Sequence, residues 1–231
     1  MREPSETLAM SLVPTLRRVP LFAELSDAEI ERVAELARER SYPRSSVILF
    51  EDDPGDALYV VVTGQVKVVL IGEDGREVIL SVLKEGNFFG EMALIDDEPR
   101  SAHVIAMEDA NLLVLRREDF QHRLREAPGM AVGLLRALSR RLREADDKIG
   151  GLVLLDVNGR VATLQLRMAD ENDGAHITRR LTHHTIAQMV GSSRETVSRT
   201  MRELAERDLV EITRNTITIR NRRALEAAAG R

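Results

Sequence analysis

The sequence predicts an α+β protein with an N-terminal β-barrel of the jelly-roll type, a long dimerisation helix and a C-terminal winged helix-turn-helix. Three observations predict this fold: short β-rich runs up to residue 115, one long helical pattern after residue 128, and two helices joined by a glycine turn near the C-terminus. We expect the barrel domain at residues 19–128, the dimerisation helix at 129–153 and the helix-turn-helix domain at 154–231.

The barrel is predicted from six short runs of β-branched and apolar residues, with turn dipeptides such as Pro54-Gly55 and Asp74-Gly75 between them. Many short strands at this spacing are typical of a barrel or jelly roll. The predicted strands are residues 47–50, 57–62, 66–71, 78–82, 102–106 and 112–115. Ahead of them, Ser26 and Glu29 form a capping box before apolar residues at helical spacing, which predicts a helix over 27–39.

The long helix is predicted from apolar residues that alternate three and four apart, the pattern of a two-stranded coiled-coil seam. The seam residues are Leu135, Leu138, Leu142, Ala145, Ile149 and Leu152. Because charged residues flank this narrow stripe, we favour a homodimer over a single helix packed on its own barrel. Asp156 is placed to cap a new helix from Val157, so we expect a hinge at residues 154–156.

Residues 182–209 have the spacing of two helices joined by a tight turn, in which Gly191 can adopt the left-handed conformation. The expected buried faces are Ile186, Ala187 and Val190 in the first helix and Val197, Met201 and Leu204 in the second. Residues 210–212 and 216–219 alternate apolar and polar side chains around Arg214-Asn215, which predicts a hairpin wing.

Composition excludes several classes of function. The chain has no cysteine, so it has no disulfide, thiolate metal site, iron-sulfur cluster or catalytic thiol, and its five histidines show no metal-ligand spacing. No apolar run is long enough to cross a membrane, and residues 1–13 are unlike a signal peptide. We therefore expect a cytoplasmic protein with no membrane association.

The charge distribution places DNA contact in the last third of the chain. Residues 157–231 hold thirteen arginines, no lysine and nine acidic residues, which gives this segment a charge of +4. Because the net charge of the chain is −5, residues 1–156 carry −9. Arginine suits phosphate and guanine contacts, because its planar fork donates to two acceptors at once. The alternative is a solvated helical surface.

The second helix of the turn motif is the candidate recognition helix, since its first turns display groups that pair with base edges in the major groove. The predicted DNA-contacting residues are Thr182, Ser193, Arg194, Glu195, Ser198 and Arg199. The alternatives are a capping box of Glu195 with Ser192 and solvated arginines.

Three ordered motifs carry a resemblance that spans residues 19–219. The run from Phe89 to Ala102 (FGEMALIDDEPRSA) resembles the phosphate-binding cassette of cyclic-nucleotide-binding domains. LDVNGR, from residue 155, and GSSRETVSR, from residue 191, resemble the CRP/FNR family of transcription regulators. The resemblance implies that the barrel binds a cyclic nucleotide, that the protein is not an enzyme, and that its partners are double-stranded DNA, a second copy of the chain and RNA polymerase.

The resemblance also implies roles for residues of the cassette. Arg100 would pair with the cyclic phosphate, Ser101 would hydrogen-bond to it, Glu91 would hold the ribose 2′-hydroxyl, and Gly90 would let the backbone approach the ligand. The predicted ligand-binding residues are Val68, Leu80, Ser81, Gly90, Glu91, Met92, Ala93, Arg100, Ser101, Arg141, Ala145 and Asp146. The alternative is that Glu91 and Arg100 pair with each other across a loop.

The chain departs from the family at Ala145 and Asp146, where cAMP-binding relatives place a threonine followed by serine or asparagine to contact adenine. An aspartate is an acceptor only, whereas guanine offers two adjacent donors. The resemblance implies cAMP as the effector, and the aspartate makes cGMP or cyclic di-GMP the alternatives. A second interpretation is a constitutive DNA-binding protein whose barrel serves only as a dimerisation scaffold. Haem ligation by His103 and a 2-oxoglutarate effector stay open, and no metal or catalytic residue is predicted.

Overall fold

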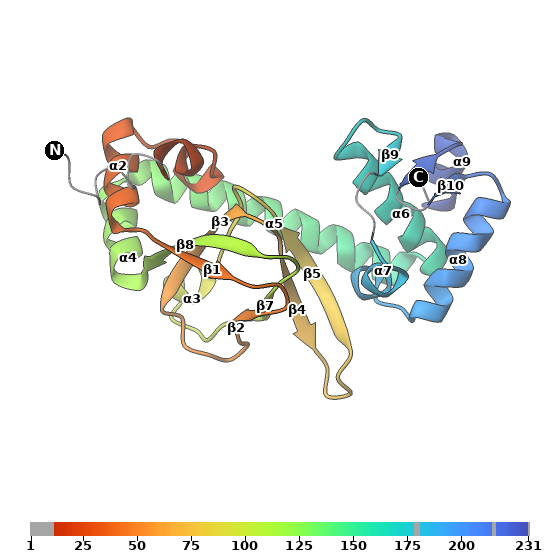
Figure 1. Cartoon of the computed structure of the whole chain (residues 1–231), viewed down its shortest axis with the longest axis horizontal. Helices are drawn as coiled ribbons and strands as arrows, with labels where there is room; N and C mark the ends of the chain where they lie inside the picture. Colours follow the sequence, from red (N-terminus) through yellow and green to blue (C-terminus); the bar gives the residue numbers. More distant parts are fainter. Residues whose placement is uncertain (1–11, 178–180, 214–215, 231) are drawn as a thin grey trace. The chain divides into compact units, whose positions relative to one another are not determined.

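The computed structural model describes residues 12–177, 181–213 and 216–230 (Figure 1). The chain divides into two compact units, residues 1–142 and 143–231, and the division falls within helix α5 (Pro128–Leu154). No helix among the described residues is long and apolar enough to cross a bilayer.

The N-terminal unit is built on two four-stranded antiparallel sheets. The first has the order β1-β8-β3-β6 and the second β2-β7-β4-β5. The strands are β1 (Arg38–Tyr42), β2 (Val47–Leu49), β3 (Ala57–Thr63), β4 (Val66–Ile71), β5 (Glu77–Leu83), β6 (Phe88–Phe89), β7 (His103–Ala106) and β8 (Ala110–Arg116). This confirms the predicted β-sheet domain, long helix and C-terminal helix-turn-helix.

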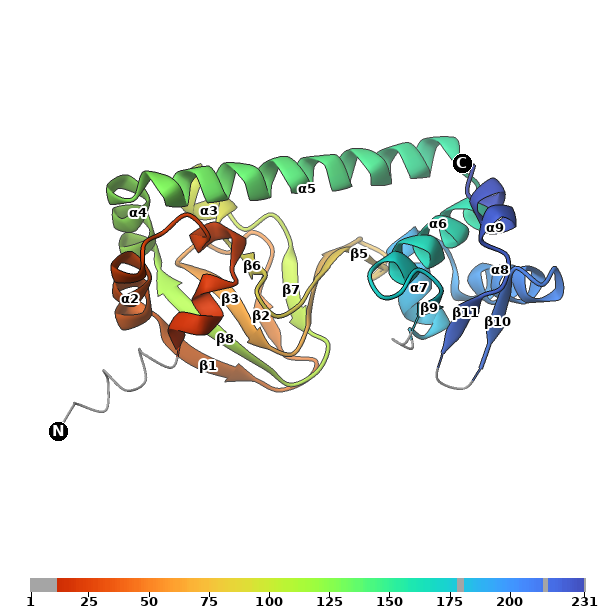
Figure 2. The same ribbon diagram turned by 90° about the horizontal axis from the view of Figure 1, so that it is seen from above.

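Alternation along β3 explains how one sheet supports two cores. Leu58 and Val60 face a cluster formed with the helices, whereas Tyr59 and Val61 belong to the cluster between the two sheets. The helices that cover the outer face are α2 (Asp27–Leu36), α4 (Arg117–Glu126) and the first turns of α5, with the short α3 (Met92–Ile95) at the edge (Figures 1 and 2).

Two local differences from the sequence prediction occur at the start of this unit. The capping box of Ser26 and Glu29 is present, but α2 ends at Leu36 and not at residue 39. The chain turns there into β1, which was not predicted because its run RERSY is charged. Pairing of β1 with β8 supplies backbone hydrogen bonds that outweigh this low β-propensity.

Helix α5 buries only its first turns against the sheet. Met130, Gly133 and Leu134 are buried, and a Cβ on Gly133 would lie 2.6 Å from the Leu21 carbonyl oxygen. Leu138, predicted as a seam residue, is partly buried against this core. The remaining large apolar side chains of the helix are exposed: Val132, Leu135, Leu142, Ile149, Leu152, Val153 and Leu154.

The C-terminal unit consists of helices and a small three-stranded sheet of order β10-β11-β9. Its elements are α6 (Val157–Asp170), β9 (His176–Ile177), α7 (His183–Val190), α8 (Arg194–Glu206), β10 (Val210–Ile212), β11 (Ile217–Ile219) and α9 (Arg222–Ala228). The Asp156 side chain accepts from the backbone N–H of Gly159, as its predicted capping role requires. Strands β10 and β11 form the predicted hairpin, and its turn residues Arg214-Asn215 lie outside the described residues.

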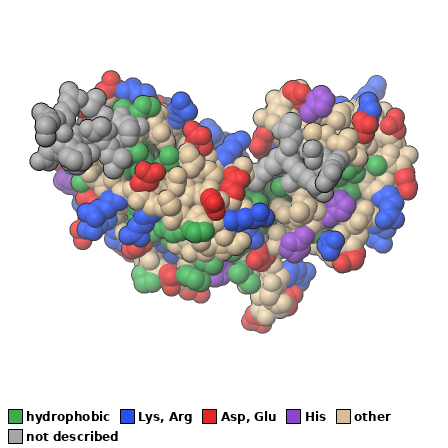
Figure 3. Space-filling model, in the orientation of Figure 1, with side chains coloured by type: hydrophobic (Ala, Val, Ile, Leu, Met, Phe, Trp, Pro, Cys, Tyr) green, Lys and Arg blue, Asp and Glu red, His purple; other side chains and the backbone are tan. Residues whose placement is uncertain are grey.

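Acidic and basic side chains are interspersed over the face of both units drawn in Figure 3, and histidines gather on the C-terminal unit. The basic residues of 157–231 are therefore mixed with acidic ones, and the net charge of this segment does not by itself locate an anion-binding site.

Candidate ligand pocket and nucleic-acid interface

The cassette brings two ionisable side chains into the interior of the N-terminal unit. Glu91 is 1% exposed and Arg100 is 4% exposed. Burial of a charge is costly unless the group is paired and hydrogen-bonded. The partners of these two groups therefore decide what the site can hold.

Arg100 is held by three oxygen acceptors. One terminal nitrogen donates to the Gly90 carbonyl at 2.6 Å, and the other donates to the Ala57 carbonyl at 2.9 Å and to Asp56 at 3.0 Å. Gly90 has φ of +84°, and a Cβ there would lie 2.7 Å from the Arg100 guanidinium. Only glycine lets the backbone come this close to the arginine.

Glu91 pairs with Arg141 of α5, whose Nη1 lies 2.5 Å from Oε1. Arg141 also donates to the Phe88 carbonyl and stacks over the Phe88 ring at 4.8 Å. Burial raises the pKa of Glu91, and Arg141 opposes that rise. The alternative in which Glu91 and Arg100 pair with each other is therefore wrong.

Each of the two buried groups keeps one polar atom without a partner among the described residues: Glu91 Oε2, an acceptor, and Arg100 Nε, a donor. A buried unpaired polar atom costs about 1–3 kcal/mol. A ligand that carries both a hydroxyl and an anionic oxygen would satisfy both atoms, so the site fits such a ligand.

The other predicted pocket residues differ in strand position and exposure. Val68 of β4 faces Ser81 of β5 across the ladder, and a bulge between Val68 and Val69 makes Leu80 an extra residue in β5. Ala93 is buried, whereas Leu80, Met92 and Ser101 are exposed. The Ser101 hydroxyl lies 3.9 Å from the Met92 sulfur.

Ala145 and Asp146 lie on α5, four and five residues beyond Arg141, and both are exposed. Arg141 is thus the α5 residue that contacts the cassette within the N-terminal unit.

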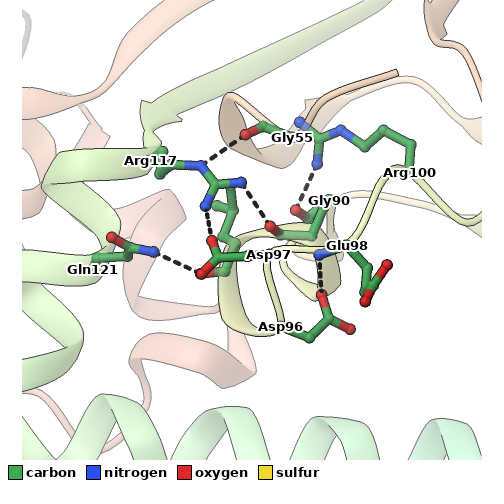
Figure 4. Close-up of polar contacts among 10 residues, drawn as sticks. Gly55, Gly90, Asp96, Asp97, Glu98, Arg100, Arg117 and Gln121 are labelled. Carbon is green, nitrogen blue, oxygen red and sulfur yellow. Dashed lines mark hydrogen bonds and ion pairs between the residues drawn. The ribbon is translucent and has the colours of Figure 1, made fainter. Parts of the chain in front are cut away.

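Sequence reasoning missed Arg117, which fixes the cassette to α4 (Figure 4). Its guanidinium donates to the Gly55 carbonyl at 2.8 Å and the Ala93 carbonyl at 2.7 Å, and it pairs with Asp97. A Cβ on Gly55 would lie 2.5 Å from Ala93 Cβ, so the loop before β3 packs directly on α3.

The candidate recognition helix is α8, capped by Ser193, whose side chain accepts from the backbone N–H of Thr196 at 3.1 Å. The alternative in which Ser192 and Glu195 form a capping box is therefore wrong, because Ser193 caps the helix. Arg194, Glu195 and Arg199 are exposed, and Ser198 is half-buried. The opposite face of α8 buries Val197, Thr200, Met201 and Leu204.

The turn before α8 has the predicted geometry. Gly191 ends α7 with φ of +64°, in the left-handed region. Thr182 caps α7, accepting from the backbone N–H of Thr185 at 3.1 Å. Thr182 and the exposed residues of α8 therefore belong to one turn motif.

Two residues of the LDVNGR motif hold this motif together, a role that sequence reasoning did not assign. Arg160 donates to the Val190 carbonyl at 2.9 Å and to the Leu155 carbonyl at 2.8 Å, which joins α6 to the end of α7. Asn158 accepts from the Thr200 hydroxyl at 2.6 Å, which joins α6 to α8.

Among the described residues, no group of three or more His, Asp or Glu side chains could hold a metal ion. His103 accepts from the backbone N–H of Glu51 at 3.1 Å, and its other ring nitrogen lies 3.6 Å from the Glu51 carboxylate.

Two family models match the chain. Residues 39–127 match the cyclic nucleotide-binding domain, and residues 159–228 match the Crp-like helix-turn-helix domain. The cyclic AMP receptor protein of Thermus thermophilus is 37% identical over 91% of this chain and 96% of its own. A CRP-like cAMP-activated global transcriptional regulator of Mycobacterium tuberculosis is 30% identical over 88% of this chain and 93% of its own.

Solved structures give the same relationship. The c-di-GMP responsive global regulator CLP of Xanthomonas campestris superposes with a TM-score of 0.74 at 26% identity, covering 85% of this chain and all of its own. The catabolite activator protein of Thermus thermophilus is 37% identical with a TM-score of 0.54, covering 91% of this chain and 98% of its own.

Proposed function

Since the chain belongs to the CRP/FNR family of transcription regulators, we propose that it binds specific DNA sequences under the control of a cyclic nucleotide. The observation that carries the proposal is that Glu91 and Arg100 are both buried and that each keeps one polar atom without a partner among the described residues. The same chain exposes Arg194, Glu195 and Arg199 on α8.

The chemistry of the pair suits a nucleoside cyclic monophosphate. Arg100 would neutralise the single negative charge of the cyclic phosphate, with Ser101 donating a hydrogen bond. Glu91, which is paired with Arg141, would accept from the ribose 2′-hydroxyl. Val68, Leu80 and Ser81 would form the wall of the pocket.

The names of the relatives and the residue at position 146 order the candidates for the nucleotide. One relative is named a cyclic AMP receptor protein and another a cAMP-activated regulator, which places cAMP first. The CLP protein responds to cyclic di-GMP, and Asp146 offers a carboxylate suited to guanine, so cGMP and cyclic di-GMP are the next candidates.

We also propose a homodimer formed by α5 that reads a palindromic operator, because Leu135, Leu142 and Ile149 form an exposed apolar stripe at heptad spacing. Half-sites would lie about one helical turn apart, as in other helix-turn-helix dimers. RNA polymerase is a proposed partner, the cytoplasm is the proposed location, and the protein would act as a regulator and not as an enzyme. The functional division would follow the predicted boundaries, residues 19–128, 129–153 and 154–231.

Calorimetric titration of the purified protein with cAMP, cGMP and cyclic di-GMP, repeated on Asp146→Ser, tests the effector. We expect saturable binding of one of the three. Guanine preference that reverts toward cAMP in Asp146→Ser would support contact between the carboxylate and the base. Tight cAMP binding that is unaffected by the substitution would contradict that contact.

A second candidate is a constitutive DNA-binding protein, favoured because Ala145 lacks the threonine hydroxyl, and Asp146 replaces the serine or asparagine, with which cAMP-binding relatives contact adenine. Fluorescence anisotropy of a labelled operator, with and without saturating nucleotide, separates the two. Unchanged operator affinity would favour the constitutive protein.

A further inference from the structure

A second polar cavity lies in the N-terminal unit, at the margin of the first sheet. It has a volume of about 110 Å³ and is lined by Arg38, Arg40, Asp56, Tyr59 and Arg116, with Ala57 and Val114 at its base. A volume of this size holds several water molecules, and therefore also a small oxyanion. Glu91 and Arg100 do not line it, although two of its lining residues, Asp56 and Ala57, accept hydrogen bonds from Arg100.

Strand register explains why these side chains converge. Arg38 of β1 pairs with Val114 of β8, and Val114 pairs with Tyr59 of β3, so the three residues form one row on one face. Arg116 stands two residues beyond Val114 and therefore points to the same face. Arg40 stands two residues beyond Arg38 and does so as well.

This face is the one that the second sheet covers, since Tyr59 and Val114 belong to the core between the sheets. Strand β1 lies at the outer edge of the first sheet, so its arginines reach past that core into solvent. The result is a cavity with an apolar base and a cationic rim.

Within the described part of the chain, the side chains of these three arginines form no hydrogen bond and no ion pair. Tyr59 as a residue is 4% exposed, and its hydroxyl makes no hydrogen bond to any described residue. Its ring stacks on Phe89 with centroids 5.1 Å apart, which fixes its direction. Because Tyr59 lines the cavity and its hydroxyl has no partner among the described residues, that hydroxyl is available to a ligand or to water.

Charge decides which ligand suits the cavity. Three arginines and Asp56 give its lining a net formal charge of +2, and Asp56 is already engaged by Arg100 at 3.0 Å. Three planar guanidinium forks and one hydroxyl donor, arranged around a single volume, match a tetrahedral dianion better than a flat carboxylate with two oxygens. We propose that this cavity binds a small phosphate dianion, either inorganic phosphate or the phosphate group of a monoester.

Burial raises the pKa of Tyr59 to about 12, and Asp56 and Tyr42 add to that rise, so the hydroxyl keeps its proton at neutral pH. It can therefore donate to an anion. Replacing Tyr59 by phenylalanine removes this donor and keeps the ring that packs on Phe89, which makes Tyr59→Phe the least disruptive test.

The experiment is isothermal titration calorimetry of the full chain in phosphate-free buffer, with inorganic phosphate and glycerol 3-phosphate as separate probes. We expect saturable binding of at least one probe with one site per chain. The tighter probe would distinguish free phosphate from a phosphate monoester. Tyr59→Phe and Arg38→Gln should each weaken binding by about tenfold or more, because each removes a hydrogen bond to a charged group.

Two further variants keep the test specific. Arg44→Gln removes an exposed arginine next to β1 that does not line the cavity, and it should leave the affinity unchanged. Ser101→Ala reports on the cassette site. Absence of saturable binding, an equal loss in Arg44→Gln and Arg38→Gln, or binding lost in Ser101→Ala but retained in Tyr59→Phe would each overturn the proposal.

Discussion

The proposed hydrogen bond between Glu91 and the nucleotide can be tested by changing its donor on the nucleotide and its acceptor on the protein. If Glu91 Oε2 accepts from the ribose 2′-hydroxyl, the wild-type protein should bind cAMP about tenfold or more tighter than 2′-deoxy-cAMP. Glu91→Gln keeps the shape and removes the charge, so this preference should shrink to a few-fold. Calorimetry with both nucleotides measures the preference in each protein.

Loss of affinity alone would not identify the contact, because Glu91 also holds Arg141. Ser101→Ala is the control, since it should weaken both nucleotides equally and leave the preference intact. An undiminished preference in Glu91→Gln would contradict the role of Glu91 at the ribose.

The hydrogen bonds of Asp173 imply that the stability of the C-terminal unit depends on pH. It accepts from the backbone N–H groups of Ala175 at 3.0 Å and His176 at 2.7 Å and from the His176 ring, and these bonds hold its pKa well below the ordinary value of 3.8. Because the pKa is depressed in the folded state, the stabilisation is present above pH 3.8 and is lost as pH falls below it.

Asp173→Asn should therefore lower the melting temperature at neutral pH, and its difference from the wild type should vanish in acid. Thermal unfolding followed by circular dichroism across this pH range measures the difference. Asp147→Asn, which removes an exposed carboxyl from α5, is the matched control. A difference that persists unchanged into acid would contradict the prediction.

Single residues differ in how far the sequence predicts them. Glu91, Gly90 and Arg100 were identified because they stand together in one motif, and the structure buries Glu91 and Arg100 together. Arg117 and Arg160 were not identified, because their partners are mainly backbone carbonyls distant in the chain, and a carbonyl has no sequence signature.

Among the elements, α5 carries the prediction of the oligomeric state. Leu142 is 64% exposed at the centre of the apolar stripe. A second copy of the helix would bury it, so Leu142→Glu should place a charge in the seam and yield monomers. Analytical ultracentrifugation measures the result.

Arg140→Glu is the control for that substitution, because residue 140 lies about 200° around the helix from residue 142 and away from the seam. A dimer that survives Leu142→Glu would show that the interface lies elsewhere.

Helix α8 carries the prediction of sequence specificity. Arg199 is exposed and lies 4.0 Å from Glu203, a weak surface pair that DNA could replace. Arg199→Ala should cost about 1–3 kcal/mol on the matched operator and little on random DNA, because the contact is to a base edge. Anisotropy titrations with both DNAs compare the losses, and equal losses would mean that Arg199 contacts only phosphate.

Element boundaries followed the sequence where a local signal marks them. The capping residues Ser26 and Asp156 and the turn residue Gly191 all have their predicted roles. Strands β1, β6 and β9 were missed, because they are charged or only two residues long and exist through pairing with distant strands.

At the scale of the whole molecule, the order of three motifs predicted the architecture, since each motif fits one type of element. The strand order within the two sheets was not predicted, because it depends on pairing between residues about 70 positions apart, as between Ser41 and Asn111. The cavity lined by Arg38 and Arg116 was also not predicted, because only the register of β1, β8 and β3 brings its side chains together.

The proposed regulation makes a prediction about the complete protein that neither site makes alone. If nucleotide binding raises operator affinity by some factor, operator binding must raise nucleotide affinity by the same factor, because the two routes around the cycle share one free energy. Allosteric proteins typically show factors of about 5–150. Operator affinity measured with and without nucleotide, and nucleotide affinity measured with and without operator, should therefore change by the same factor.

The variant Ser101→Ala should require a higher nucleotide concentration for the same effect, without changing the operator affinity reached at saturation. Scrambled DNA is the control for nonspecific contact. A factor of one in both directions would contradict effector control and favour the constitutive protein, whereas unequal factors would reveal a further equilibrium, such as dimer dissociation, linked to one of the ligands.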